Sequence, residues 1–280
     1  MRIAALGDIH GNHFALEACL EQIEKMNIKT IAFLGDYITD CPYPEKTIKL
    51  LKNTQETYHT HFIRGNREDY MISHHLNPND AWTYGSRYGS LLYTYEHLTS
   101  EDIAWFQSMP ESMVVHTQGA ENFEICHGSL QTNRCLLLPG SAAWKETPSI
   151  MQTNLLLCAH SHKSFIHEQC GKRIVNGGSV GLNVQGGTKA EFAVIEYTGT
   201  EWEPRLVGVE YDIENAVKEF YESGLIEKGN VWARACMNIM KTGRHYAMEC
   251  LQTVNRMKAD MNTGQDEEYL WESVAQSLGI

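Results

Sequence analysis

The sequence predicts an α/β fold with a largely parallel sheet, for three reasons. Short apolar runs of strand length alternate with helix-length amphipathic segments over the early part of the chain. Five of these runs end in Asp, Asn or His, usually beside a glycine. The chain has 280 residues, of which 42% are hydrophobic, enough for one large domain or a domain with a smaller lobe.

The predicted strands are short and either apolar or β-branched, which suits strands covered on both faces. The early strands are expected at residues 3–6, 30–34, 61–63, 123–126 and 155–158. Further strands are expected at 114–116, 173–175, 191–197 and 205–211. Because helices separate the first three strands, we expect those strands to be parallel.

Two helices are predicted between the early strands. Residues 12–26 place apolar side chains on one helical face, and Asn12 occupies the position of an N-cap. Residues 43–52 contain Pro44 near their start, where proline favours a first helical turn.

Residues 68–110 interrupt the alternation and are interpreted as a helical insertion over the sheet. Thr99 and Asp102 have the spacing of a capping box within it. Residues 212–280 again favour helices. We therefore expect a core domain at 1–211 and a helical C-terminal lobe at 212–280.

Composition argues against several classes of partner. The formal net charge is −12, whereas a nucleic-acid surface needs clustered Lys and Arg, so no stable nucleic-acid binding is expected. Asp8 follows the first apolar run at once, which is unlike a signal peptide, and no run is long enough to span a membrane. The eight cysteines form no C-x-x-C pair, which favours reduced thiols in a cytoplasmic protein.

Polar side chains follow all five early strands. They are Asp8 and His10, Asp36, Asn66 and Arg67, His127, and finally His160 and His162. The carboxyl ends of parallel strands share one sheet edge, where α/β proteins place their sites. Oxygen and imidazole ligands suit Mn, Fe or Zn. A carboxylate such as Asp36 can bridge two ions, which can then clamp a phosphoryl group and activate water.

Each of these residues has an alternative interpretation as a helix cap or a turn residue. That interpretation is the better one for Asn12 and a fair one for any single member of the set. It is a poor explanation for five strand ends together.

The motifs GDIH, GDYITD, GNRE, ICHG and AHSH, in this order, resemble those of the calcineurin-like metallophosphoesterases. The loop VNGGSVG at 175–181 also resembles a loop of that family. The resemblance extends from Asp8 to about Gly181. It implies an α/β sandwich of two mixed sheets flanked by helices, with a helical insertion and a helical C-terminal lobe.

The resemblance also implies a two-metal site. Asp8, His10 and His162 would bind the first ion, Asn66, His127 and His160 the second, and Asp36 both. Asp36, Asn66, Arg67 and His127 would be the catalytic residues. The ions would be Mn, Fe or Zn, with Mn expected to be active in vitro. A metal-bound hydroxide would attack phosphorus in line.

Arg67 departs from the family pattern, in which many members carry a His that protonates the leaving group. Arginine is a poor acid because its pKa exceeds about 12, but it can hold a phosphate oxygen. The alternative is a surface salt bridge to Glu68 or Asp69. Asn12 and His13 are further candidate substrate contacts, at the start of a helix beside the site.

Other polar residues are weaker candidates. Arg134 and Lys163 could contact substrate. Asp40 could hydrogen-bond a metal ligand, but we favour a turn before Pro42. In the insertion, Tyr84, Arg87 and Tyr88 could stack on a base and hold a phosphate, although packing and surface roles are favoured.

The sequence therefore predicts a metal-dependent phosphoesterase. A small nucleotide or a dinucleoside polyphosphate is the favoured substrate, because a phosphate leaving group needs less help from an acid. The resemblance includes bacterial diadenosine polyphosphate hydrolases with a helical lobe. A phosphodiesterase, a phosphoprotein phosphatase and a non-catalytic metal-binding scaffold are the alternatives. A homo-oligomer is compatible with the sequence.

Overall fold

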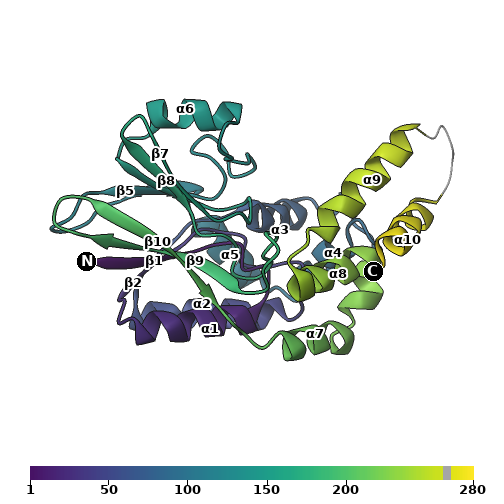
Figure 1. The fold of residues 1–280 in the computed structure, drawn as a ribbon. Coiled ribbons are helices and arrows are strands. Elements are labelled where there is room, and N and C mark those ends of the chain that lie inside the picture. The colour runs from purple at the N-terminus through teal and green to yellow at the C-terminus, as the bar shows by residue number, and fades with distance from the viewer. Residues whose placement is uncertain (261–265) are drawn as a thin grey trace.

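The computed structural model describes residues 1–260 and 266–280. Within these ranges the chain forms two mixed five-stranded sheets packed face to face, with helices on both outer sides (Figure 1). The predicted sandwich of two mixed sheets is confirmed. The expectation of a largely parallel sheet holds only at the centre, because each sheet has antiparallel strands at its margins.

The first sheet has the strand order β10-β9-β1-β2-β3. Its strands are β1 (Arg2–Leu6), β2 (Thr30–Phe33), β3 (His59–Phe62), β9 (Ala190–Tyr197) and β10 (Trp202–Val209). β1, β2 and β3 are parallel, with Ile3 opposite Thr30 and Thr30 opposite His59. Their carboxyl ends therefore meet at one edge.

The second sheet has the order β4-β5-β6-β8-β7. Its strands are β4 (Ser112–Val115), β5 (Phe123–Cys126), β6 (Leu155–Cys158), β7 (Phe165–Gln169) and β8 (Lys172–Asn176). β5, β6 and β8 are parallel, so they too end at a common edge. Between the two sheets lies an apolar layer that includes Ile3, Ala32, Ile125 and Leu157.

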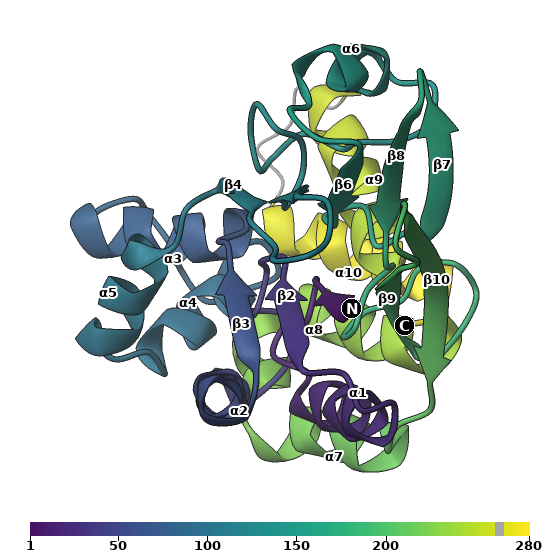
Figure 2. The same cartoon turned by 90° about the vertical axis from the view of Figure 1, so that its left-hand side faces the viewer.

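Helices cover the outer faces of the sandwich (Figure 2). α1 (His13–Lys25) and α2 (Pro44–Thr57) pack on the first sheet through Leu16, Ile48 and their neighbours. α6 (Ala142–Ile150) packs on the second sheet through Trp144. These amphipathic helices bury one face each, which is the usual source of helix stability in a protein of this type.

The remaining helices lie beside the sandwich. α3 (Asn66–Leu76), α4 (Gly89–Glu96) and α5 (Ser100–Ser108) lie next to β3 in Figure 2. α7 (Ile213–Glu222), α8 (Leu225–Thr242), α9 (Tyr246–Asp260) and α10 (Glu267–Leu278) form the right-hand part of Figure 1. No helix of the described ranges is long and apolar enough to cross a membrane.

Local predictions were mostly confirmed. The Asn12 side chain accepts a hydrogen bond from Ala15 N at 3.1 Å, as an N-cap does. Thr99 and Asp102 form the expected capping box. β7 and α6 were not predicted, because β7 is a polar edge strand of sequence FIHEQ and α6 contains Pro148, which reads as a helix breaker. β3 begins two residues before its predicted start and α2 ends later than expected.

Candidate metal centre

The polar residues that follow the five strands converge at one edge of the sandwich. Five of them have backbone φ angles in the left-handed region, namely 53° at Asp8, 52° at His10, 53° at Asp36, 67° at His160 and 54° at His162. This conformation is uncommon for residues other than glycine, and its concentration here is typical of a functional site. The tight turns direct consecutive polar side chains into the same space.

Asp8, His10 and His162 form a first group that could hold a metal ion, with one potential ligand atom from each residue within 4.8 Å of the others. The Nε2 atoms of His10 and His162 are 3.0 Å apart. His162 Nε2 lies 3.7 Å from Asp8 Oδ1. The two rings thus direct their nitrogens at the same point rather than at separate partners.

Asp36, His127 and His160 form a second group with the same property. His127 Nε2 lies 3.3 Å from Asp36 Oδ2. Asn66 lies against this group, since its Oδ1 is 3.2 Å from the same His127 nitrogen. The structure therefore brings together the seven residues expected to be ligands.

Three of the histidines have an oxygen within 3.0 Å of Nδ1. Nδ1 of His127 lies 2.7 Å from the carbonyl oxygen of Leu34, and Nδ1 of His162 lies 2.8 Å from that of Leu182. Nδ1 of His10 lies 3.0 Å from Oδ2 of Asp40. An acceptor at Nδ1 favours the tautomer that leaves the Nε2 lone pair free for a metal.

The side-chain chemistry fits a cation. Asp8 is fully buried, and within the described ranges neither of its carboxylate oxygens has a hydrogen-bond partner. Burial, with a contribution from Asp36, raises the pKa of Asp8 to about 6. An unpaired buried carboxylate is costly unless a cation neutralises it. A divalent ion between Asp8 and the adjacent imidazoles would do so.

The electrostatics divide the histidines into two kinds. Burial and the nearby His127 lower the pKa of His160 to about 4, so its ring is neutral at pH 7 and able to bind a metal. Burial alone would lower the pKa of His127, but the Asp36 carboxylate raises it to about 9. Burial would likewise raise the pKa of Asp36, but His127, His10 and Arg67 hold it well below its usual range.

Arg67 lies within the site and not on the surface. Its Nη2 is 3.1 Å from Asp40 Oδ2, its backbone N–H donates to Asp36 Oδ1 at 2.8 Å, and its Nε is 3.8 Å from Asp36 Oδ2. The alternative of a salt bridge to Glu68 or Asp69 is wrong. Glu68 instead accepts hydrogen bonds from backbone N–H groups, including that of Asp36 at 2.9 Å.

Asp40 corrects one expectation. It does not merely open a turn, because it is buried against His10, Arg67 and the indole of Trp232 on α8. Trp232 Nε1 donates to Asp40 Oδ1 at 2.7 Å. Sequence reasoning missed Trp232 because it lies far along the chain, in a segment interpreted as ordinary helix packing.

The loop VNGGSVG at 175–181 holds the backbone of the turn that carries Asp8 and His10. Ser179 Oγ donates to the backbone carbonyl oxygen of Asp8 at 2.8 Å, and Gly181 N donates to the same oxygen at 2.9 Å. A Cβ atom at Gly181 would lie 1.9 Å from the carbonyl oxygen of Ile9, so only glycine fits there. The loop therefore fixes the turn that carries Asp8 and His10.

A cavity of about 420 Å³ opens over the metal-binding groups. Arg67, Arg134 and Lys163 contribute cationic side chains to its lining. α8 and α9 form the opposite wall through Trp232, Met248 and other residues. Its volume lies within the range of about 300–1,000 Å³ that is typical of small-molecule sites.

The other two candidate substrate contacts lie apart from this cavity. Asn12 donates through Nδ2 to the carbonyl oxygen of Gly181 at 3.0 Å, in addition to capping α1. His13 Nε2 lies 2.8 Å from Glu219 Oε2 on α7. Both residues line a separate small cavity beside α7.

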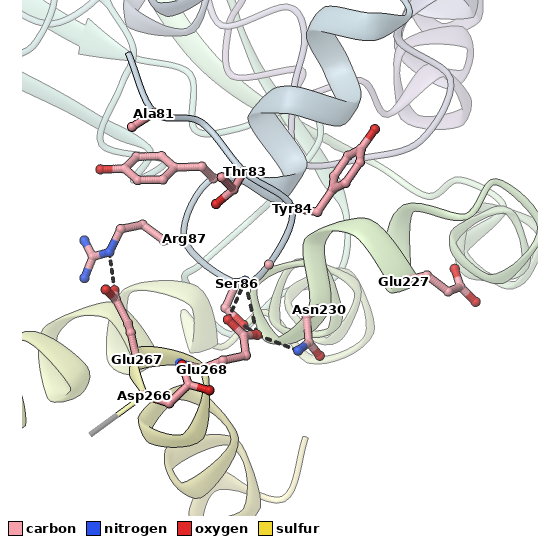
Figure 3. Close-up of a pocket in the computed structure, with 12 residues that line it drawn as sticks. Ala81, Thr83, Tyr84, Ser86, Arg87, Glu227, Asn230, Asp266, Glu267 and Glu268 are labelled. Atoms are coloured by element: carbon pink, nitrogen blue, oxygen red, sulfur yellow. Dashed lines mark hydrogen bonds and ion pairs between the residues drawn. The ribbon is translucent and has the colours of Figure 1, made fainter. Parts of the chain in front are cut away.

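Of the candidates in the insertion, Arg87 lies beside the start of α10 (Figure 3), whereas Tyr84 hydrogen-bonds to Glu96 of α4. Arg87 pairs with Glu267, and Ser86 and Asn230 both hydrogen-bond to Glu268. Because Arg87 is paired with Glu267, the alternative that Arg87 holds a phosphate has no support, in line with the favoured packing or surface role. Figure 3 shows instead that these contacts attach the 81–88 segment to α10 and α8.

Comparisons with known proteins identify the family and support the fold. The model of the calcineurin-like phosphoesterase superfamily domain matches residues 1–200. An uncharacterised protein of Methanocaldococcus jannaschii is 23% identical over 80% of this chain and 94% of its own. The crystal structure of a hypothetical protein from Pyrococcus horikoshii has a TM-score of 0.74, at 22% identity over 86% of this chain and 98% of its own. The crystal structure of a metallophosphoesterase from Sphaerobacter thermophilus has a TM-score of 0.67, at 21% identity over 87% of this chain and 100% of that chain.

Proposed function

The chain belongs to the calcineurin-like phosphoesterase superfamily and is a metal-dependent phosphoester hydrolase, and from that premise we propose that it uses two metal ions to hydrolyse a small nucleotide or a dinucleoside polyphosphate. The observation that carries the two-ion proposal is the position of Asp36. Its Oδ2 lies 3.8 Å from His10 Nε2, in the first group, and 3.3 Å from His127 Nε2, in the second. One carboxylate can therefore bind both ions.

The potential ligand atoms fall into two separate groups, which supports two ions rather than one. The first would use Asp8, His10 and His162, and the second His127, His160 and Asn66. These are oxygen and imidazole donors, with no thiolate among them, which suits Mn, Fe or Zn. When bound, such ions would activate a water as the nucleophile and neutralise phosphate charge.

Arg67 supports a phosphorylated leaving group. Its guanidinium lines the cavity beside the metal groups and remains charged at every working pH. It can bind an oxygen of the substrate phosphate and stabilise the charge that develops during hydrolysis. It cannot donate a proton to a leaving alkoxide. A leaving phosphate needs no such proton, so we propose cleavage of a phosphoanhydride in preference to an ester of a poor leaving group.

The helices that face the metal centre support a small substrate. Residues of α8 and α9 close one side of the cavity. We propose that residues 212–280 act as a lobe that limits access to small phosphorylated molecules. Substrate contacts by Asn12 and His13 stay predictions. All eight cysteines lie in the described ranges and are free thiols, which supports a reducing compartment such as the cytoplasm.

The test is hydrolysis by protein that has been stripped with a chelator and then reloaded with Mn²⁺. The panel contains p-nitrophenyl phosphate, bis(p-nitrophenyl) phosphate, ATP and diadenosine tetraphosphate. We expect metal-dependent turnover that favours the two polyphosphates. Turnover of the bis ester alone would assign a phosphodiesterase instead. Absence of turnover of all four compounds by the metal-loaded protein would overturn the proposal.

A further inference from the structure

A second cavity adjoins the one over the metal centre. Its volume is about 310 Å³, and it shares Arg67 and Trp232 with the metal cavity. It lies between α3 and the 81–91 segment on one side and helices α8, α9 and α10 on the other. The two cavities therefore meet at a boundary made of one arginine and one tryptophan.

Aromatic rings dominate the lining of this second cavity. Tyr70, Trp82, Tyr88, Trp232 and Trp271 all contribute. Trp82 stacks on the ring of His74, with centroids 4.1 Å apart and an interplanar angle of 5°, so its orientation is fixed. Trp232 and Trp271 meet edge to face at 6.3 Å. Preset aromatic faces of this kind bind planar rings at little conformational cost.

Three polar atoms of the lining residues lack hydrogen-bond partners. Within the described ranges, Arg67 Nε, Ser90 Oγ and Trp271 Nε1 are buried without a hydrogen bond, and all three residues line this cavity. Arg87 also lines it but is paired with Glu267, as Figure 3 shows. No acidic residue is among its described lining residues. The cavity thus suits a flat, uncharged ring with hydrogen-bond acceptors rather than a second phosphate.

We propose that this aromatic cavity is the subsite for the nucleobase of the substrate. The base would stack among the rings while the phosphates lie beyond Arg67, at the metal centre. The assignment of the phosphates rests on the proposed function, but base binding can be measured without any turnover. Stacking tolerates different bases because every base has a π face, so the subsite selects nucleotides as a class.

The test compares two hydrolysis-resistant ligands that differ only in the adenosine group. They are α,β-methylene ADP and methylenediphosphonate, titrated calorimetrically into the Mn²⁺-loaded protein. We expect α,β-methylene ADP to bind about tenfold more tightly, because stacking on an aromatic side chain typically contributes a factor of this size. Equal affinities, or binding of neither compound, would overturn the proposal.

Single-residue variants test whether the tighter binding of α,β-methylene ADP arises in the aromatic cavity. Tyr88 is 38% exposed and lines the aromatic cavity. Tyr88→Ala should therefore weaken the binding of α,β-methylene ADP about fivefold or more and leave the affinity for methylenediphosphonate unchanged. Trp82→Leu keeps apolar bulk without the ring and should act in the same way. Tyr84→Ala is the matched control, because Tyr84 is 47% exposed in the same segment and lines the neighbouring cavity of Figure 3 but not the aromatic cavity.

The outcomes separate the subsite from the proposed function. Selective loss of α,β-methylene ADP binding in Tyr88→Ala would support the subsite even if no polyphosphate were hydrolysed. If Tyr88→Ala weakened both ligands equally, or if Tyr84→Ala gave the same loss as Tyr88→Ala, the subsite would be rejected even for an active hydrolase.

Discussion

Trp232 on α8 donates its indole N–H to Oδ1 of Asp40 at 2.7 Å, and this bond joins a helix of the C-terminal region to the candidate metal centre. The other oxygen of Asp40 lies 3.0 Å from Nδ1 of His10 and 3.1 Å from Nη2 of Arg67. One buried carboxylate therefore positions an expected metal ligand, an expected phosphate-binding arginine and a helix that lines the substrate cavity.

Replacing Asp40 by Asn should weaken metal binding by about 10- to 100-fold, the usual cost of losing an acceptor that orients a ligating histidine. The substitution preserves shape but removes the charge that faces His10 and Arg67. Manganese titration by calorimetry measures the effect. Asp212→Asn, at the exposed N-cap of α7, is the control that should change nothing at the site. Unaltered affinity in Asp40→Asn would show that Asp40 does not position His10.

Replacing Asp36 by Asn should reduce metal-dependent turnover to background. Asn can still accept the backbone N–H of Arg67 through Oδ1, as Asp36 does at 2.8 Å, so the local fold should persist. The lost charge is the one shared by the two histidine groups. Metal content per chain, measured by elemental analysis, should fall from two ions toward one. A variant with two ions and full activity would contradict the bridging role.

The strand-end pattern was sufficient to predict an α/β fold and the residues that converge at one sheet edge, whereas the sandwich of two mixed sheets was implied by the family resemblance. It succeeded because the site is built on β1, β2, β3, β5 and β6, whose carboxyl ends are fixed by parallel pairing. The left-handed backbone at residues such as Asp8 and His160 gave no sequence signal, since no glycine marks those positions.

Contacts between distant segments could not be predicted. Asp40 beside Pro42 has the pattern of a turn, and only the arrival of Trp232 from α8 shows that it is a buried acceptor. The aromatic cavity has the same origin, because Tyr70 of α3, Tyr88 of the segment before α4 and Trp271 of α10 are brought together by tertiary packing. The hydrophobic periodicity of a single helix or strand does not indicate which distant segment will pack against it.

Arg67→Gln separates substrate binding from metal binding. The change removes a partly exposed guanidinium that lines the cavity, so KM for ATP should rise about tenfold, as expected for a charge-assisted hydrogen bond. Metal affinity should stay the same or increase, because the cation next to Asp36 and Asp40 is gone. Steady-state kinetics and manganese titration check the two parts. A variant whose metal affinity collapsed would show that Arg67 is structural.

Metal affinity should increase with pH. In the metal-free protein, burial acts to lower the pKa of His127, but the Asp36 carboxylate raises it to about 9, so the ring carries a proton at neutral pH. That proton occupies Nε2, which must be free before a metal can bind. One released proton implies about a tenfold gain in affinity per pH unit below the pKa.

Calorimetric manganese titrations between pH 6.5 and 8.5, in buffers of different ionisation enthalpy, measure both the affinity and the protons released. His127→Gln should abolish most of the dependence of manganese affinity on pH. A dissociation constant that does not vary with pH in the unmodified protein would contradict the raised pKa of His127.

Metal binding should stabilise the fold strongly, because it neutralises the Asp8 carboxylate, which is otherwise buried without a hydrogen bond in the described ranges. Free Mn²⁺ at about 100 times its dissociation constant should add about 2.7 kcal/mol of unfolding free energy. For a chain of this size that corresponds to an increase in Tm of about 5–10 °C.

Asp8→Asn tests the cause of that increase. Both carboxylate oxygens of Asp8 are buried without hydrogen bonds in the described part of the chain, and burial raises the pKa of Asp8 to about 6. At pH 7.5 the ionised side chain therefore destabilises the metal-free fold, and a neutral Asn removes this cost. We expect Asp8→Asn to have a higher Tm than the unmodified protein without metal and a much smaller increase with Mn²⁺. If Mn²⁺ raised the Tm of both proteins equally, the stabilising ion would not be bound to Asp8.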